Sequence, residues 1–553
     1  MLERSTARLR FRFFVAGSVL TMLVASAACG DDGASDGTNE GGTGGGGAQD
    51  GGGAGGTAEG GTGEGGSSEG GTNQGGTGAG GDVTGGGGEG GGPSVPDTVA
   101  PNLTVTGLED GVLLRTARMR FEAAASDDVE LARFGYVLNG QSETEIPIEQ
   151  GMPSSTSVLD LRPTRGNNTL VVFAEDAAGN RTEVPLSARL TRSTAAGGAH
   201  TGVVANGQVI VWGRNNLTQL GLGPGDTTSR TTPVVVPGLS SITAIELRQN
   251  QSLALAQDGT LYGWGNNADG RLGLGAPGTP DTSNRDTPTP IAAFAGVLQV
   301  ASGYDHTLVL REDGTVWSFG DNSMGQLGDG TTDDRSYPAA VMGLSDIIQV
   351  VGGSKHSLAL GRDGTVWAWG RNEYANLGQG TTDEEPHMAP AQVPGLSGIV
   401  QLASGRDHVL ALRDDGVVLG WGLNQNGQVG VGTSGVDADV LSPAEIALDG
   451  VVALIADGNY SFAVLDDGTA VGWGQNFNGQ LGIGSDDTTE RSAPSDPLLM
   501  TDVEEIDPGA THAVGVTNTG TVYTWGWSTN GSLGRADLLN NWAYPAPGLV
   551  TLP

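Results

Sequence analysis

The chain lacks features that several classes of protein need. It has one cysteine in 553 residues, so no disulfide can form within the chain and its stability must come from packing. Beyond the N-terminus no apolar run approaches about 18 residues, so no later segment is predicted to span a membrane as a helix. Only 27 Lys and Arg stand against 63 Asp and Glu, and the formal net charge is −36. Such a surface repels phosphate backbones, so we expect no nucleic-acid partner.

The motifs of common enzyme classes are also missing. The sequence contains no nucleophile elbow, no Walker-type loop and no zincin motif. Gly-rich strings are frequent, but none has the strand–loop–helix context that a phosphate cradle requires. We therefore predict that the protein is not an enzyme, and we assign it no catalytic residue, no cofactor and no metal ligand.

Residues 1–28 are typical of an export signal, because four arginines precede an apolar run that ends in small residues. Cys29 follows directly and resembles the lipobox cysteine of bacterial lipoproteins, whose thiol is acylated. Ser26 departs from the usual Leu or Val, so ordinary cleavage and secretion remain the alternative. Gly30 stands where an aspartate would favour retention in the inner membrane. These residues predict a bacterial cell-envelope lipoprotein, in the outer membrane, held there by its lipid anchor only.

Two segments separate this anchor from the main body. Residues 29–97 are almost pure Gly with small and acidic residues, a composition that cannot bury a core and predicts a disordered tether. Residues 98–188 carry short alternating strands separated by turns, which predicts a β-sandwich. The segments 126–130 and 173–182 resemble hairpins of bacterial Ig-like domains. Their aspartates suit either Ca²⁺ or turn formation, and both readings stay open.

One phrase, clearest as Trp-Gly-x-Asn-x-x-Gly-Gln-x-Gly-x-Gly, recurs seven times through residues 189–553. A period of about 52 residues indicates a stacked or circular repeat. Within a unit, an apolar strand, an Asp-Gly turn, a Trp-bearing strand, a Pro-led strand and a second apolar run give about four strands. Four-stranded sheets repeated radially form a propeller. The aromatic anchors are Trp212, Trp264, Phe319, Trp369, Trp421, Trp473 and Trp525.

The full unit, with Gly-x-x-His-x-Leu-x-Leu before the Asp-Gly turn, resembles the RCC1 repeat (regulator of chromosome condensation). The resemblance implies a seven-bladed propeller. Together with the two preceding segments, the expected fold is all-β, with a small Ig-like sandwich and a disordered Gly-rich linker before the propeller. Because the last unit stops before its final apolar strand, we predict that residues 188–195 supply it. The first and last segments would then complete one blade together, whereas a competing reading gives part of 186–192 to the sandwich.

Three repeated columns are predicted to be structural. Histidines at equivalent places in different blades are too far apart to share a metal, so we expect them to anchor loops by hydrogen bonds. Asn in the repeated phrase bonds its own turn, and loop arginines should pair with nearby aspartates. The His column holds His200, His306, His356, His408 and His512, with Gln251 and Tyr460 in the other two copies.

Positions where the copies disagree are the predicted partner-binding residues, because a repeat keeps its framework and varies what it displays. Aromatic and arginine side chains are common interface anchors. These residues are Tyr304, Asp305, Lys355, Arg371, Tyr374, Arg406, Asp407, Phe477 and Trp527. Relaxed constraint on loops would give the same scatter.

Three functions remain open. The first is a monomeric envelope lipoprotein whose propeller binds a protein or glycan, which suits bacterial RCC1-like propellers that inhibit secreted enzymes through loops on one face. The second is an envelope hydrolase or lyase with its site in the propeller cavity. The third, implied by the family resemblance, is guanine-nucleotide exchange on a small GTPase, which the export signal and the negative charge oppose.

Overall fold

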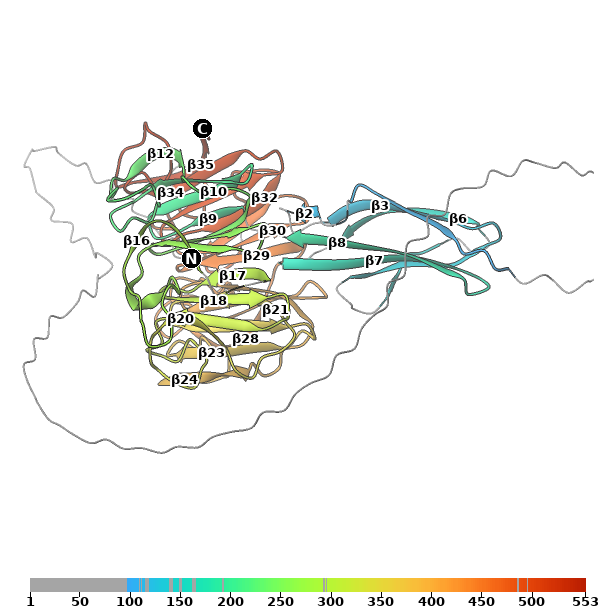
Figure 1. The fold of residues 1–553 in the computed structure, drawn as a ribbon, viewed down its shortest axis with the longest axis horizontal. Helices are drawn as coiled ribbons and strands as arrows, with labels where there is room; N and C mark the ends of the chain where they lie inside the picture. The colour runs from blue at the N-terminus through green and yellow to red at the C-terminus, as the bar shows by residue number, and fades with distance from the viewer. Residues whose placement is uncertain are drawn as a thin grey trace, which may run out of the picture. The chain divides into compact units, whose positions relative to one another are not determined.

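The computed structural model describes residues 97–553, apart from short gaps at 109, 111, 115–118, 139–142, 149–151, 162–165, 191–192, 292–293, 295, 485–486 and 495. The predicted signal peptide, Cys29 and nearly all of the tether lie outside the described residues. The regular secondary structure of the described residues is almost entirely β-strand (Figure 1). The one exception is a short 3-10 turn, η1 (Ala268–Gly270). No helix in this part of the chain is long and apolar enough to cross a membrane.

Residues 102–190 form two sheets that share one hydrophobic core. Alternation explains the pairing. In β3 the side chains of Met119, Phe121, Ala123 and Ala125 are buried, while that of Glu122 between them is exposed. The predicted sandwich is therefore present, and its last strand continues past the predicted boundary at 188. One sheet has the order β1 (Asn102–Thr106), β3 (Met119–Ser126), β6 (Ser154–Leu161); the other has β2 (Val112–Leu114), β8 (Arg181–Leu190), β7 (Gly166–Asp176), β4 (Leu131–Leu138), β5 (Thr144–Glu145).

The described residues from 194 onward form seven antiparallel sheets, which we call blades 1 to 7 in chain order. The first strands of neighbouring blades contact one another in a cycle that ends with the last blade against the first, so the ring is closed. Blades 1 to 3 are β9 (Thr194–Ala196), β10 (His200–Ala205), β11 (Gln208–Gly213), β12 (Arg230–Val235); β13 (Ile242–Arg248), β14 (Gln251–Ala256), β15 (Leu261–Gly265), β16 (Arg285–Pro290); and β17 (Val297–Ser302), β18 (His306–Arg311), β19 (Val316–Gly320), β20 (Arg335–Ala340).

Blades 4 to 7 continue the pattern, with one incomplete sheet. They are β21 (Ile347–Gly352), β22 (His356–Gly361), β23 (Val366–Asn372), β24 (Asp383–Gln392); β25 (Ile399–Ser404), β26 (His408–Arg413), β27 (Val418–Gly422), β28 (Val440–Ile446); β29 (Val451–Asp457), β30 (Tyr460–Leu465), β31 (Ala470–Gly474); and β32 (Val503–Pro508), β33 (His512–Thr517), β34 (Val522–Ser528), β35 (Trp542–Val550). In blade 6, isolated bridges to Arg491 and Pro497 replace a fourth strand.

Blade 4 shows why the sequence folds this way. The turn between β22 and β23 places Gly364 at a φ of +79°, which glycine adopts without strain. The Asp363 carboxylate accepts hydrogen bonds from the backbone N–H and the hydroxyl of Thr365. Equivalent Asp-Gly turns close the same hairpin in the neighbouring blades, so the chain reverses at the same place in each repeat.

The predicted strand exchange at ring closure is wrong. Residues 194–196 do supply a first strand, β9, but it pairs with β10 in blade 1, and blade 7 has its own first strand in β32. The physical reason is the short connection between the apolar run and the His strand that follows it, which favours pairing within one hairpin. The repeat unit predicted from the sequence therefore begins one strand later than the blade that forms in the structure. The competing reading of 186–192 is confirmed as far as Leu190, where β8 of the sandwich ends.

Candidate functional site

A four-group clasp joins one blade to the next. At the seam between blades 3 and 4, His306 Nε2 lies 2.9 Å from Ser357 Oγ, and Ser357 Oγ donates to the carbonyl oxygen of Gln326 at 2.8 Å. Trp369 Nε1 donates to the same carbonyl at 2.8 Å. All four residues are fully buried. Because the serine proton goes to Gln326, the serine oxygen must accept from His306, which makes Nε2 the protonated nitrogen of the neutral imidazole.

The clasp also joins blades 1 and 2 and blades 5 and 6, and it closes the ring between blades 7 and 1. Between blades 4 and 5 and between blades 6 and 7, Val409 and Ala513 stand in the serine position, and only the indole-to-carbonyl bond is kept. At the last seam, Thr201 contacts His512 and the carbonyl of Ser532, which also accepts from Trp212. Burial lowers the pKa of His306 to about 3 and that of His512 to about 4, so both are neutral at physiological pH. The prediction that the His column is structural is confirmed. The other indole donors are Trp264, Trp421, Trp473 and Trp525.

The two other predicted framework columns behave as expected. The Asn322 side chain accepts from the Leu327 N–H and donates to the Thr331 carbonyl, holding its own loop. Loop arginines pair locally with aspartates in four blades, which removes them as free cations. These pairs are Arg230–Asp226, Arg285–Asp281, Arg335–Asp329 and Arg491–Asp487.

The seam between blades 2 and 3 differs at all four clasp positions. Gln251 replaces His, Thr307 replaces Ser, Arg271 replaces Gln and Phe319 replaces Trp. Gln251 Nε2 reaches Thr307 Oγ1 only at 3.4 Å, and Thr307 donates to the Arg271 carbonyl at 2.9 Å. Phe319 has no N–H, so this carbonyl lacks the indole donor found at the other seams.

A buried ion pair crosses the axis of the ring. Arg248 Nη1 lies 2.6 Å from Asp457 Oδ2, and Arg248 also donates to the carbonyls of Gly352 and Ser404. Burial opposes the charge of Arg248, but the Asp457 carboxylate raises the pKa of Arg248 above its ordinary value. The adjoining axial cavity, lined by first strands of blades 2 to 6, has a volume of only about 70 Å³.

Sequence reasoning missed this pair, although its signal was present. Arg248 and Asp457 occupy the Gly position of Gly-x-x-His in the two copies whose His is replaced, by Gln251 and Tyr460. A Cβ at Gly303, an equivalent position, would lie 2.0 Å from the ring of its histidine. A side chain at the Gly position therefore requires loss of the His, and the two changes occur together.

The connections between first and second strands, and between third and fourth strands, all lie at one edge of the blades, because the strands alternate in direction. We call this edge the loop face. Seven of the nine predicted partner-binding residues lie in these connections, and Arg371 and Trp527 lie near the ends of β23 and β34 at the same edge. The structure brings some of them together and leaves others apart.

The first group lies near the axis. The guanidinium of Arg406 lies 5.9 Å from the Tyr304 ring centroid, and that of Arg248 lies 5.8 Å from the same centroid. Burial raises the pKa of the Tyr304 hydroxyl. Asp407 is only 2% exposed and is held by the Ser354 hydroxyl and by Arg406 Nε. The expectation that Asp407 faces outward is therefore wrong, because the buried carboxylate orients Arg406 instead.

The remaining residues lie farther along the loops. Arg371 pairs with Glu373, and its guanidinium lies 5.0 Å from the Tyr374 ring centroid. The Phe477 side chain is 58% exposed, whereas Trp527 is partly buried. Aromatic and arginine side chains of this kind are frequent anchors in protein interfaces.

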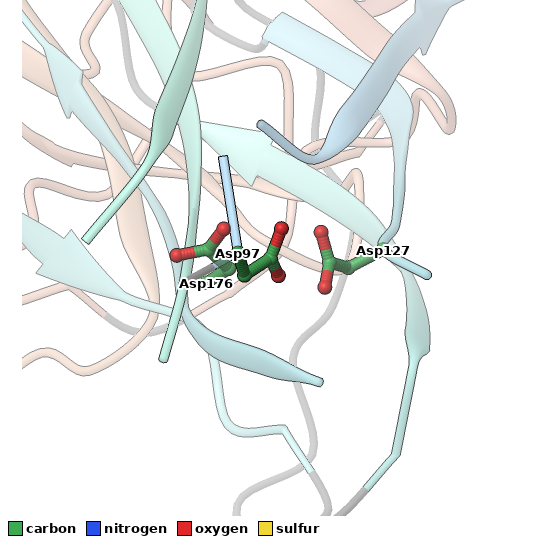
Figure 2. A group of neighbouring side chains, drawn as sticks. All are labelled: Asp97, Asp127 and Asp176. Carbon is green, nitrogen blue, oxygen red and sulfur yellow. The ribbon is translucent and has the colours of Figure 1, made fainter. Parts of the chain in front are cut away.

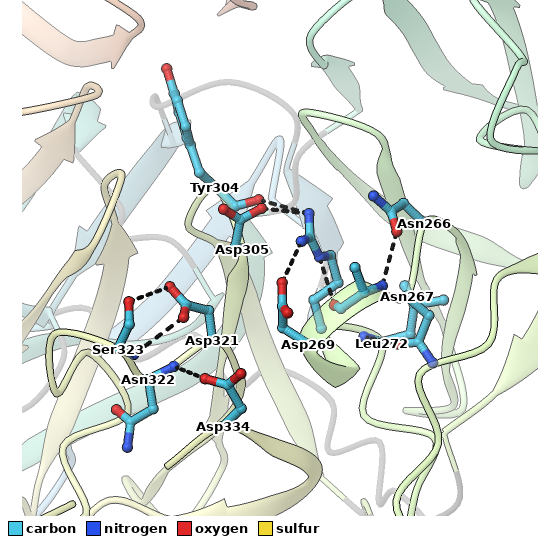
Figure 3. Close-up of polar contacts among 12 residues, drawn as sticks. Asn266, Asn267, Asp269, Leu272, Tyr304, Asp305, Asp321, Asn322, Ser323 and Asp334 are labelled. Carbon is cyan, nitrogen blue, oxygen red and sulfur yellow. Dashed lines mark hydrogen bonds and ion pairs between the residues drawn. The ribbon is translucent and has the colours of Figure 1, made fainter. Parts of the chain in front are cut away.

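Asp305 and Lys355 belong to a charged cluster on blades 2 to 4. Asp305 Oδ1 lies 2.5 Å from Arg271 Nη1, and Lys355 Nζ donates to Ser323 Oγ at 2.9 Å. Figure 3 shows Asp305 among the neighbouring carboxylates Asp269, Asp321 and Asp334. Sequence reasoning did not include Asp269 or Asp334.

A second acidic group lies in the sandwich. Carboxylate oxygens of Asp97, Asp127 and Asp176 lie within 4.8 Å of one another, the one such convergence in the part of the chain that is described (Figure 2). Oxygen ligands of this kind suit a hard cation such as Ca²⁺. The same side chains also form turns, since Asp127 Oδ1 accepts from the N–H groups of Val129 and Glu130. The turn reading thus has direct support, and the absence of a metal stays a prediction.

Known proteins share this architecture. A family model described as an RCC1-like domain matches residues 164–456, and one for the regulator of chromosome condensation (RCC1) repeat matches 505–532. The ultraviolet-B receptor UVR8 of Arabidopsis thaliana is 31% identical over 296 residues, covering 52% of this chain and 64% of the receptor. The X-linked retinitis pigmentosa GTPase regulator of Canis lupus familiaris is 36% identical over 356 residues, covering 63% of this chain.

The chain therefore spans 64% of the plant receptor and 34% of the canine regulator. Among solved structures, Prp20p from Saccharomyces cerevisiae aligns with a TM-score of 0.57 and 25% identity, over 63% of this chain and 87% of that one. The seven closed blades, the repeated clasp and the match to more than half of the sequence agree. The chain belongs to the RCC1-like domain family.

Proposed function

We propose that the protein is a binding protein of the bacterial cell envelope, whose loop face contacts a protein partner. The observation that carries this proposal is the division within each repeat. The His, Ser and Trp positions are buried and used between blades, whereas the positions that vary display Arg371, Tyr374 and Phe477 on the loop face. Such side chains are frequent anchors in protein interfaces.

Relatives support a protein partner over a glycan. The RCC1-like propeller is a protein-interaction fold, and the Prp20p structure is described with its binding to Gsp1p and histones. The cell-envelope location comes from the sequence alone, through the export signal and Cys29. We propose that a lipid on Cys29 and the glycine-rich tether hold the folded domains near the membrane, at a reach of roughly 45 Å for the tether.

The two alternatives fit less well. An enzyme site in the propeller cavity would need room for a substrate, but the axial cavity of about 70 Å³ holds only a few waters. The ionic groups beside it are used by the Arg248–Asp457 pair. Nucleotide exchange would need contact with a GTPase, and although some relatives are named GTPase regulators, an export signal would separate this chain from such a partner.

The test is cross-linking capture from envelope extracts, with the full chain as bait. The loop-face variant carries Arg371→Ala, Tyr374→Ser and Phe477→Ser, and we expect it to lose a protein that the unchanged chain captures. A matched variant on the opposite edge of the blades, Asp258→Asn with Asp363→Asn, should capture it normally, because Asn also holds these turns. Equal capture by all three proteins contradicts the proposal. Mass spectrometry of the mature N-terminus separately shows whether Cys29 is acylated.

A further inference from the structure

A cleft opens at the one seam whose clasp is altered throughout. It lies between the long loop of blade 2 and the start of β20 in blade 3, with a volume of about 510 Å³. Its size is within the range of small-molecule and side-chain binding pockets. Side chains lining it include Asp269, Pro280, Thr282, Asp334, Ser336 and Tyr337.

The walls of the cleft are tied to each other. The Gly275 N–H donates to the Ser336 carbonyl at 2.8 Å, and the Asp281 N–H donates to Ser336 Oγ at 3.1 Å. Ser336 is only 6% exposed. A Cβ at Gly270 would lie 2.2 Å from the Ser336 Cα, so the blade 2 loop packs directly on β20. The cleft is thus already formed in the free protein, and little ordering is needed for binding.

The cleft is acidic, and the nearby cations are engaged elsewhere. Arg271 is shared between Asp269, at 2.9 Å, and Asp305. Asp334 accepts a hydrogen bond from the Asn322 N–H and forms no ion pair within the described part of the chain. Burial and the charges of Asp321 and Asp269 raise the pKa of Asp334. A cation entering the cleft would relieve this repulsion.

The arrangement favours an organic cation over a metal ion. Asp269 and Asp334 are not part of any group of three ligating side chains that converges within 4.8 Å among the described residues. Tyr337 instead adds an aromatic ring to the wall, and ammonium and guanidinium groups pack well against such rings. The strongly negative chain would also attract a basic partner from a distance.

We propose that this cleft receives one lysine or arginine side chain of the protein partner, with Asp334 and Asp269 as its acceptors and Tyr337 as its aromatic wall. This inference rests on the proposed function, since it names the chemistry of the partner that the loop face binds. It also assigns a role to the altered seam. Arg271 supplies the clasp carbonyl at this seam, and its guanidinium organises the acidic lining.

The test uses the paired variant Asp269→Asn with Asp334→Asn. Both substitutions have precedent in this chain. Asn426, Asn478 and Asn530 occupy the position equivalent to Asp269, and Asn284 makes the Asn267 contact that Asp334 makes to Asn322. The variant should therefore fold. Its charge-matched control is Asp258→Asn with Asp363→Asn, which removes the same charge from turns on the opposite edge.

The probe is a library of short random peptides displayed on phage and selected against the full chain. We expect enriched peptides to share a Lys or Arg, and synthetic copies to bind the paired variant about tenfold or more weakly than the control. Replacing the Lys by norleucine, or the Arg by citrulline, should weaken binding similarly. No enrichment, enrichment without a basic residue, or equal binding to both variants overturns the inference.

Failure of this inference and failure of the proposed function give different results. If envelope capture finds a partner that binds the paired variant as well as the control, the loop face binds protein but the cleft does not take its cation. If no partner is captured, the proposed function fails, and the peptide measurements still decide whether the cleft prefers a basic side chain.

Discussion

The seam between blades 3 and 4 and the seam between blades 2 and 3 are built from the same repeat, yet they differ in every clasp residue. The first has His306, Ser357, Gln326 and Trp369, and His306 Nε2, Ser357 Oγ and Trp369 Nε1 are all hydrogen-bonded inside the protein. The second has lost the indole donor and has a longer side-chain contact, and an acidic cleft lies beside it. The comparison teaches that a repeat protein can change one junction without opening the ring, because six other junctions remain.

The largest difference between the seams should appear with pH. A buried histidine whose pKa falls from 6.5 to about 3 stabilises the fold fully above 6.5, and this stability is lost as pH falls toward 3, because the unfolded chain binds protons first. Each such histidine contributes up to about 1.4 kcal/mol per pH unit. The urea midpoint should therefore drop steeply from pH 6.5 to 4.5, above the range where most carboxylates titrate.

His306→Gln, which copies the Gln251 arrangement, should reduce the slope of stability against pH by the contribution of one buried histidine. The same substitution should lower the midpoint only slightly at pH 8. A pH profile identical to that of the unchanged chain would mean that His306 is not held neutral in the seam.

Removing the indole from the intact seam should have the next largest effect. Trp369→Ala leaves a cavity at a fully buried site and should lower the apparent free energy of unfolding by about 3–5 kcal/mol in urea titrations. Trp369→Phe copies the altered seam and should cost only about 1 kcal/mol, since Ser357 still donates to the Gln326 carbonyl. Equal costs for the two variants would show that the indole hydrogen bond, and not packing, dominates the seam.

A consensus substitution in the altered seam should have a smaller effect than Trp369→Ala, and it should be unfavourable. Gln251→His restores the commonest residue of the column, but Arg248 precedes it where other copies have Gly. At Gly353 a Cβ would lie 2.0 Å from the ring of its histidine, so the new imidazole must collide with the Arg248 side chain. We expect a loss of about 1–3 kcal/mol. A stabilised protein would show that the Gly and His positions are independent.

Most of the fold could be predicted from the sequence, because glycine turns and apolar alternation repeat seven times. The sandwich core and the buried His and Trp columns followed from the same patterns. The strand assignment at ring closure did not, since a periodic sequence has no natural starting point and the predicted unit began one strand later than the observed blade. The ion pair between Arg248 of blade 2 and Asp457 of blade 6 could not be predicted from local sequence patterns. A signal was present, because both residues replace the repeat's Gly in copies that have also lost the His.

The candidate site was predictable only in part. Variation among copies identified loops such as Arg371–Tyr374, which do stack, but it also selected Asp407, whose carboxylate is buried. A residue that varies between copies can orient a neighbouring side chain of the same protein, as Asp407 orients Arg406, and need not contact a partner itself. The acidic lining around Asp269 and Asp334 escaped notice because it joins two loops that are far apart in sequence and meet only in the folded ring.

The most direct test measures stability and partner capture on the same two variants, one altered in a seam between blades and the other altered on the loop face. Trp369→Phe should lower the urea midpoint and leave capture from envelope extracts unchanged. Arg371→Ala with Tyr374→Ser should leave the midpoint unchanged and reduce capture severely. The account would be contradicted if the loop-face variant captured its partner at full strength, or if the seam variant alone lost it while still folded.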